Sequence, residues 1–393
     1  MIVYLAGETG DSPEHHEELA AKAIAFGHGY ALKGANHFLF SFAYEEAKRR
    51  AEYFCKQPRR RIFIDSGAYT AWTGKCEPIV NRKYLDFCKK VMDLKQCPVV
   101  FAALDVIAGK ITDSKWPPSR EDSERACEKG WANYQAMKQE GIGPCLMTFH
   151  QFDDPKWLTM LKDESDYFAV SHSKRRDVPD ALKNKWIKDV FDTVKPLDKS
   201  SGTARLTKKI HGLGLTRIEW MKEYPFYSVD STAWLQAGKG NLTSICGPSG
   251  QVHTRSLKVW TRRAAANGIL GDLENGVSPK NMKYFRECLG IVPGVDDRNG
   301  NWGSYFKLIQ SMGAYMEQEY FVTKYWREEK GLTLDHEPPE RQRENEPPIA
   351  EVLAELEALE RQNARWNAKV EKQIRDPEVA EWLGLKEKKA QRK

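Results

Sequence analysis

The stretch IFIDSGAY, residues 62–69, joins a short apolar run to a carboxylate, a serine and a glycine. Such a run is long enough for a buried strand, and the Ser-Gly pair after it is typical of a turn. A charged, helix-like segment follows at residues 82–94. This order predicts a strand, a turn and a crossover helix, the unit from which parallel sheets are built.

The same kind of apolar run recurs along the first 230 residues. Eight runs occur, at residues 2–6, 37–42, 62–65, 99–105, 145–150, 167–172, 209–213 and 226–230. Helix-like segments, for example residues 120–140 and 180–194, separate most of them. Eight strands that alternate with helices close a barrel, so the sequence predicts an α/β fold, a (β/α)8 TIM barrel with a C-terminal helical extension.

Three regions are expected along the chain. Residues 1–235 form the catalytic barrel, residues 236–336 an extension that packs on it, and residues 337–393 a Pro-rich charged linker with an amphipathic helical tail. Apolar residues in this tail are spaced alternately by three and four, as in a coiled coil. The tail helix therefore either docks on the barrel or pairs with a second chain to form a homodimer.

Composition favours a soluble protein with an anionic partner. The chain has 393 residues, 41% of them hydrophobic, and a formal net charge of +6. It contains no apolar stretch of membrane-spanning length and no C-x-x-C pair among its cysteines. We expect no membrane association, reduced thiols and a cytoplasmic location.

Polar residues stand at the carboxyl ends of the predicted strands. They are Asp65, Asp105, His150, His172 and Asp230. In an eight-fold barrel this edge carries the active site. Any one of them can instead mark the start of a loop: Asp65 with its Ser-Gly as a turn, Asp230 with its Ser-Thr as a helix cap, and His172 as a solvated residue.

Three motifs are sharper than the rest: IDSGAY at residues 64–69, HGLG at 211–214 and SVDSTAW at 228–234. Together they resemble the transglycosylase superfamily that includes queuine and archaeosine tRNA-ribosyltransferases. The likeness is greatest to its phage-type branch, the DpdA-like DNA 7-deazaguanine transglycosylases, and covers roughly residues 1–235. The resemblance implies a pentosyltransferase that exchanges guanine in a nucleic acid for a free 7-deazaguanine base such as preQ0.

The resemblance also implies the catalytic residues. Asp230 matches the family's nucleophilic aspartate and Asp65 the aspartate of its Asp-Ser-Gly motif. A carboxylate can trap the sugar as a covalent glycosyl-enzyme adduct, while a second carboxylate moves protons to and from the bases. Two displacements at one carbon retain its configuration and require no cofactor, so none is expected.

A base pocket is predicted around these two aspartates. Asp105 matches the family aspartate that binds the guanine edge, and Tyr69 and His211 are placed to stack on the base from opposite sides. Gly212 is expected to let the backbone approach the base, and His150 occupies the neighbourhood of a family glutamine. The full predicted substrate-binding set is Asp105, Tyr69, Ser66, Gly67, His150, Ser171, His211 and Gly212.

Two basic clusters are candidates for phosphate contacts. They are Arg59, Arg60 and Arg61 before the third strand, and Lys174, Arg175 and Arg176 after the sixth. Each can also be an ordinary solvated surface.

The sequence departs from the tRNA enzymes in one respect. Their closely spaced zinc-binding cysteines are missing, and only the dispersed Cys246, His253 and Cys288 lie in that half of the chain. No metal is therefore predicted, and DNA is favoured over tRNA as the polymer. A tRNA-guanine transglycosylase and a non-catalytic nucleic-acid-binding barrel remain the alternatives, and a phage-encoded enzyme would act in its host's cytoplasm.

Overall fold

A computed structural model gives the fold of the chain. It describes residues 1–10, 12–17, 20, 37–58, 60–109, 117–175, 177–200, 203–238, 242–246, 250–256 and 302–333. The predicted tail, residues 337–393, lies outside this part, so that prediction stays a prediction.

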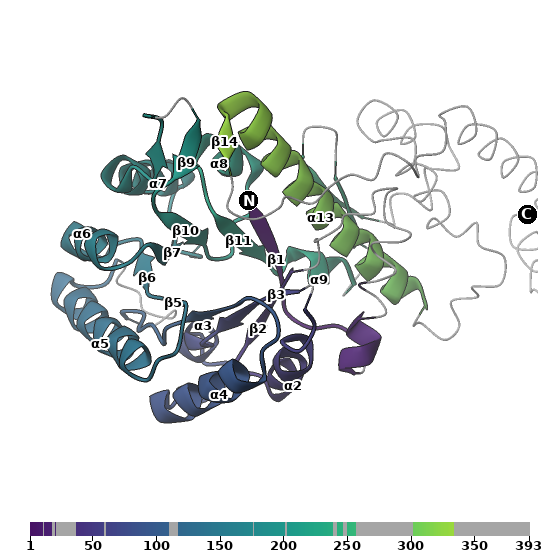
Figure 1. Cartoon of the computed structure of the whole chain (residues 1–393), viewed down its shortest axis with the longest axis horizontal. Helices are drawn as coiled ribbons and strands as arrows, with labels where there is room; N and C mark the ends of the chain where they lie inside the picture. Colours follow the sequence, from purple (N-terminus) through teal and green to yellow (C-terminus); the bar gives the residue numbers. More distant parts are fainter. Residues whose placement is uncertain are drawn as a thin grey trace, which may run out of the picture.

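The main sheet is an all-parallel barrel, as the sequence predicts (Figure 1). Its strands follow one another in chain order around the barrel, and β1 pairs with β11. They are β1 (Ile2–Ala6), β2 (His37–Ser41), β3 (Arg61–Asp65), β4 (Val99–Ala102), β5 (Cys145–Leu146), β6 (Thr148–His150), β7 (Tyr167–Ser171), β10 (Lys209–Gly212) and β11 (Ser228–Ser231).

The barrel closes between β5 and β6, which are two halves of one predicted strand. β5 pairs with β4 and β6 pairs with β7, and only Met147 separates the two halves. The Ala169 N–H donates to the Met147 carbonyl at 2.9 Å. The ends of the hydrogen-bonded sheet are therefore consecutive in the chain, and the eight apolar runs correspond to the eight positions of the barrel.

Helices surround the sheet. Along the chain they are α2 (Glu45–Phe54), α3 (Ala68–Trp72), α4 (Asn81–Leu94), α5 (Arg120–Gln139), α6 (Pro155–Glu164), α7 (Asp180–Val194), α8 (Ile218–Glu223), α9 (Ala233–Gly238) and α13 (Trp302–Lys330). The short strands β8 (Leu197–Asp198), β9 (Ala204–Leu206) and β14 (Leu332–Thr333) form a small sheet, and β12 (Leu242–Cys246) with β13 (Val252–Ser256) a hairpin.

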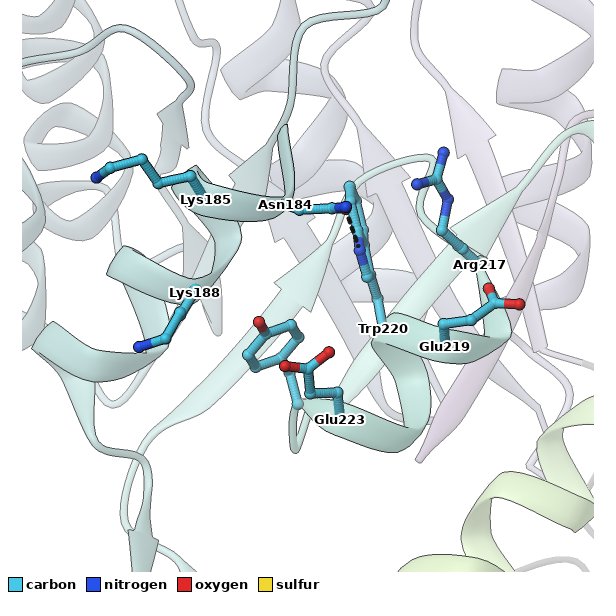
Figure 2. A pocket seen from close by; sticks show the side chains of 8 residues that line it. Asn184, Lys185, Lys188, Arg217, Glu219, Trp220 and Glu223 are labelled. Atoms are coloured by element: carbon cyan, nitrogen blue, oxygen red, sulfur yellow. Dashed lines mark hydrogen bonds between the residues drawn. The ribbon is translucent and has the colours of Figure 1, made fainter. Parts of the chain in front are cut away.

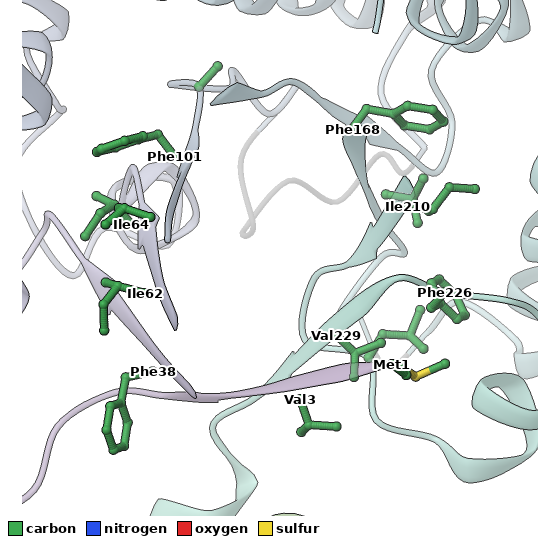
Figure 3. Close-up of a cluster of buried hydrophobic side chains, with 14 of the residues drawn as sticks. Met1, Val3, Phe38, Ile62, Ile64, Phe101, Phe168, Ile210, Phe226 and Val229 are labelled. Atoms are coloured by element: carbon green, nitrogen blue, oxygen red, sulfur yellow. The ribbon is translucent and has the colours of Figure 1, made fainter. Parts of the chain in front are cut away.

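Strand side chains alternate between the barrel interior and the helical layer. Ile62, Ile64 and Val229 belong to the outer core under the helices (Figure 3). Phe63 and Tyr4 belong to a second cluster that fills the inside of the barrel. Because side chains two residues apart share a face, Asp65 follows Phe63 into the interior at the carboxyl end of β3.

α13 lies along the outside of the barrel, where it contacts β1, α8, α9 and β12 (Figure 1). Its Glu319 Oε2 accepts from the Val3 N–H at 2.8 Å, and its Trp326 Nε1 donates to the Met221 carbonyl at 2.7 Å. The helix that follows β11, α9, is short. The longer α13 therefore covers the outside of the barrel where the first strand, β1, pairs with the last strand, β11.

Within the described ranges, no helix is both long and apolar enough to cross a lipid bilayer.

Candidate active site

The predicted polar residues meet at one mouth of the barrel. Asp65, His150, Ser171 and Asp230 lie at the carboxyl ends of β3, β6, β7 and β11, and Asp105 follows β4. Because all of these strands are parallel, their carboxyl ends share one face. This face holds the candidate active site.

Asp65 has an unusual protonation equilibrium. Burial raises the pKa of its carboxyl group to about 6, and the negative charges of Asp105 and Asp230 add to this, against the opposing effects of the Ser41 hydroxyl and the Gly67 amide. Negative charges disfavour the ionisation of a nearby carboxyl group. Because the three aspartates also share the carboxyl ends of the parallel strands, we treat them as one acidic cluster.

The turn after Asp65 positions its carboxylate. The Gly67 N–H donates to Asp65 Oδ2 at 3.1 Å. Gly67 has a φ of +83°, and a Cβ there would lie 2.8 Å from the Ala43 Cβ, so only glycine fits. Ser66 is buried and its Oγ donates to Asp105 Oδ1 at 3.3 Å. The predicted substrate-binding role of Ser66 and Gly67 is thus replaced by one behind the site, where they orient the two aspartates.

Asp230 is held by the neighbouring strand connection. Its side chain is 8% exposed, and its Oδ1 accepts from the Gly214 N–H at 2.6 Å. His211 Nε2 lies 3.4 Å from the same oxygen. Gly214 has a φ of +60°, which aims its amide at the carboxylate. The HGLG motif therefore holds the candidate nucleophile in place.

Asp105 and His150 form a pair at the same mouth. His150 Nε2 lies 2.9 Å from Asp105 Oδ2, and both side chains are mostly buried. Burial alone would lower the pKa of His150, but its hydrogen bond to Asp105 and the charges of Asp105 and Asp153 outweigh burial and raise it. Asp153 also accepts from the His150 N–H at 2.8 Å, which fixes the end of β6. The pair gives the site a carboxylate with a fixed orientation and a histidine beside it.

Lys174 belongs to this site rather than to a phosphate-binding surface alone. Its Nζ donates to the carbonyls of Leu213 and Gly214 at 3.0 and 2.9 Å. Although part of its side chain is exposed, desolvation lowers the pKa of Lys174 to about 8, against the raising effect of the Asp230 charge. Lys174 therefore steadies the turn that holds Asp230. Its position three residues after the end of β7, on the active-site face, was the sequence signal that could have indicated this role.

His211 and Gly212 do not fit their predicted roles at the base. His211 is fully buried, and its ring stacks on Phe63 with centroids 4.4 Å apart, which leaves no open face for a base. A Cβ on Gly212 would lie 3.1 Å from the Phe226 ring. Because Phe226 belongs to the outer core, this glycine is needed for packing on the helical side of β10 and not for approach to a base.

Aromatic side chains border the Asp65 side of the mouth. Tyr69 is 44% exposed and lies in α3, directly after the Asp65 turn. Trp72 lies next to it with ring centroids 5.8 Å apart, and its Nε1 donates to the Gly109 carbonyl at 2.7 Å. Tyr69 is thus available for stacking, and Trp72, which the sequence analysis did not single out, supports it.

The first basic cluster lies at the wrong end of the barrel for the predicted contact. Arg60 and Arg61 stand at the amino end of β3, opposite the mouth that holds Asp65. Arg60 pairs with Glu17 at 3.3 Å and lies over aromatic rings. Burial raises the pKa values of the interior residues Tyr4 and Tyr167, and the charge of Arg61 offsets part of this rise, which places Arg61 near the barrel interior. Arg60 and Arg61 therefore lie far from the candidate site, and their predicted contact with nucleic acid stays a prediction.

The second basic cluster lies on the active-site face. Arg175 pairs with Asp177, with Nη2 2.7 Å from Oδ2. Ser171, predicted as a substrate contact, is half-buried at the end of β7 beneath this loop. Arg59 and Arg176 lie outside the described residues.

A surface groove lies away from this mouth, between α7 and α8. Figure 2 shows Asn184, Arg217 and Trp220 along it, with Trp220 Nε1 donating to Asn184 Oδ1 at 2.9 Å. Its walls combine lysines with Glu219 and Glu223, on the helical layer outside the barrel. None of the predicted catalytic residues lines this groove.

Among the described residues, no three His, Cys, Asp or Glu side chains are arranged to hold a metal ion. Cys246 is buried, Cys288 lies outside the described residues, and nothing is described of the His253 side chain.

Comparison of the chain with protein-family models gives no match, and comparison with curated proteins gives none. The resemblance to the transglycosylase superfamily therefore stays a prediction from the sequence motifs.

Proposed function

We propose that this protein is a DNA guanine transglycosylase, a pentosyltransferase that exchanges guanine for a free 7-deazaguanine base such as preQ0. The observation that carries the proposal is the cluster of Asp65, Asp105 and Asp230 at one barrel mouth, in which two neighbouring carboxylates help to raise the pKa of Asp65 to about 6. Perturbed carboxylates in a shared cleft are typical of catalytic sites.

Asp230 is suited to act as the nucleophile. Its carboxylate attacks C1′ of the target nucleotide, and the bond to guanine breaks with its electron pair leaving on the base. The Gly214 N–H on Oδ1 keeps the carboxylate oriented for this attack. The product of the first half-reaction is a glycosyl ester on Asp230.

Asp65 is suited to move the proton. With a pKa of about 6 it is present in both protonation states near neutral pH. The protonated form donates to the departing guanine, and the resulting carboxylate takes a proton from the incoming 7-deazaguanine. That base then attacks C1′, the ester breaks, and the electron pair returns to Asp230.

Base recognition falls to Asp105 and Tyr69. A carboxylate has two oxygens for the N1–H and the exocyclic amine of a guanine-like base, and His150 and Ser66 fix the orientation of Asp105. Tyr69 offers an exposed ring at the same mouth for stacking. A base inside a duplex must leave its stack to reach them.

DNA is preferred as the polymer because the sequence lacks the cysteine module of the tRNA enzymes. Incubation with radiolabelled guanine and either DNA or tRNA tests the proposal directly. Label in DNA that disappears in Asp230→Ala supports it, whereas label in tRNA alone transfers the chemistry to the alternative substrate. Binding of nucleic acid with no label in either polymer would favour a non-catalytic barrel and contradict the proposal.

A further inference from the structure

A chain of polar side chains crosses the barrel interior beneath Asp230. Tyr167 Oη lies 2.6 Å from Ser228 Oγ, and Ser228 Oγ lies 2.7 Å from His211 Nδ1. The three residues come from β7, β11 and β10 and are buried. Their sequence neighbours Phe168, Val229 and Ile210 face the outer core, so all three side chains turn inward.

The chain ends at the candidate nucleophile. His211 Nε2 lies 3.4 Å from Asp230 Oδ1, and this buried nitrogen makes no hydrogen bond within the described part of the chain. One face of the imidazole lies against Phe63, and Tyr4 approaches it edge-on with centroids 6.0 Å apart. The ring is therefore fixed by its packing, and water does not reach it.

Two directions of these hydrogen bonds fit the distances, because each hydroxyl can donate or accept. Burial raises the pKa of Tyr167 well above its usual value, so this hydroxyl keeps its proton. If Tyr167 donates to Ser228, the Ser228 hydroxyl donates onward to His211 Nδ1. A neutral imidazole that accepts at Nδ1 carries its proton on Nε2, which faces Asp230. The opposite direction would aim a lone pair at the carboxylate.

We propose that His211 is a positioning residue for Asp230. Tyr167 and Ser228 hold it in the tautomer that places an Nε2–H 3.4 Å from the carboxylate, within reach of a hydrogen bond after a small shift. The catalytic consequence rests on the proposed base exchange. When the glycosyl ester breaks in the second half-reaction, its electron pair returns to the Asp230 oxygens, and an N–H donor already aimed at that place stabilises the departing carboxylate. In the first half-reaction the same donor holds the attacking oxygen in place.

Two substitutions of similar shape distinguish the roles of the two ring nitrogens of His211. The amide nitrogen of glutamine reaches the place of Nε2, whereas asparagine reaches only the place of Nδ1. We expect His211→Asn to lower kcat for exchange about 100-fold with little change in KM for DNA. His211→Gln should keep kcat within about tenfold of the wild type, because it restores a donor to Asp230. Equal losses in the two variants, or a more active asparagine variant, would overturn the proposal.

A readout that does not depend on activity distinguishes failure of this inference from failure of the proposed function. Nitrogen-15 NMR of labelled histidines in the full-length protein should find His211 protonated at Nε2 and bare at Nδ1, and Ser228→Ala should abolish this preference. If His211 of the wild-type protein is protonated at Nδ1 alone, the inference is contradicted even if the enzyme exchanges bases. If the NMR spectrum shows the expected tautomer but the protein transfers no labelled guanine, the hydrogen-bond chain is supported and the base-exchange proposal is contradicted.

Discussion

Asp65 is enclosed by the barrel and lies beside two other carboxylates. Each of these two conditions disfavours the ionised form of its side chain. Burial and the charges of Asp105 and Asp230 raise its pKa to about 6. Placing three acidic groups at one mouth costs folding free energy, and proteins accept such a cost mainly at functional sites.

The cost can be measured as a dependence of stability on pH. The pKa of Asp65 rises from 3.8 to about 6 on folding, so the folded state binds its proton more tightly than the unfolded state. The penalty is complete above pH 6, shrinks as the pH falls and vanishes below about 4. We expect Asp65→Asn to raise the free energy of unfolding by about 1–3 kcal/mol at pH 8.

Urea unfolding at pH 8 and at pH 4.5 checks this expectation, with a smaller gain at the lower pH. Asp166→Asn is the matched control, because Lys208 lowers the pKa of that exposed aspartate. An Asp65→Asn variant that is destabilised at pH 8 would contradict the account of the cluster.

Lys174 offers a second test at this scale. Its ammonium group binds the carbonyls of Leu213 and Gly214, next to the amide that holds Asp230. We expect Lys174→Met to lower kcat for exchange about tenfold, because the nucleophile is held less firmly. The salt dependence of DNA binding should stay unchanged, since this ammonium group is already held by two backbone carbonyls.

Lys185→Met, on the outer side of α7, is the matched control and should change neither quantity. A lower salt dependence with unchanged kcat would return Lys174 to the phosphate-binding role that the sequence suggests.

The sequence was sufficient to predict the three aspartates, since each follows an apolar run and the ends of parallel strands meet. It was not sufficient for His211. Whether its ring faces a base or fills the barrel depends on packing against Phe63, a residue nearly 150 positions away. The inward turn of Lys174 is equally non-local, because its acceptors belong to a later strand connection.

At the scale of single elements, the turn between β3 and α3 is the most constrained part of the site. Gly67 needs a positive φ and leaves no room for a Cβ next to Ala43. We expect Gly67→Ala to cost about 2–4 kcal/mol of stability, from the backbone conformation together with the overlap. Thermal and urea unfolding measure the loss.

Gly74→Ala separates the two contributions. Gly74 also has a positive φ, of +72°, but nothing lies within 4 Å of a Cβ placed there. This control should cost only about 1–2 kcal/mol. Equal losses at the two positions would mean that the contact with Ala43 does not constrain the turn.

Helices and strands could be predicted from the sequence where the local pattern of apolar residues determines them. Apolar runs of four to seven residues predicted the barrel strands, because a parallel strand is buried on both faces. The place of α13 was not predictable in this way. Its Glu319 satisfies the Val3 N–H over a separation of 316 residues, and no local periodicity indicates such a contact.

At the scale of the whole molecule, the two ends of the barrel differ in the charged residues that they carry. The carboxyl end holds the aspartates, Lys174 and Arg175, whereas the amino end holds Arg60 and Arg61. The sequence already contained this distinction, because a residue before a parallel strand lies opposite one after it. Nucleic acid bound at the mouth is therefore expected to contact only the second basic cluster.

This division predicts how salt affects DNA binding. The slope of the logarithm of the DNA-binding constant against the logarithm of the salt concentration reports the number of phosphate contacts. Arg175→Gln should reduce the magnitude of this slope by about 1, the value of one contact, and Arg60→Gln should leave the slope unchanged. Fluorescence anisotropy with a labelled oligonucleotide over a series of salt concentrations measures both slopes. An effect of Arg60→Gln equal to that of Arg175→Gln would mean that DNA does not bind at the carboxyl end alone.

The most direct test of the whole account is mass spectrometry of the protein trapped during exchange. Wild-type protein is mixed with a guanine-containing DNA oligonucleotide, quenched by denaturation and digested. The account predicts DNA lacking one guanine attached to the peptide that contains Asp230, and no adduct in Asp230→Ala. An adduct on another residue, or base exchange that proceeds without any adduct, would contradict the assignment of Asp230 as the nucleophile.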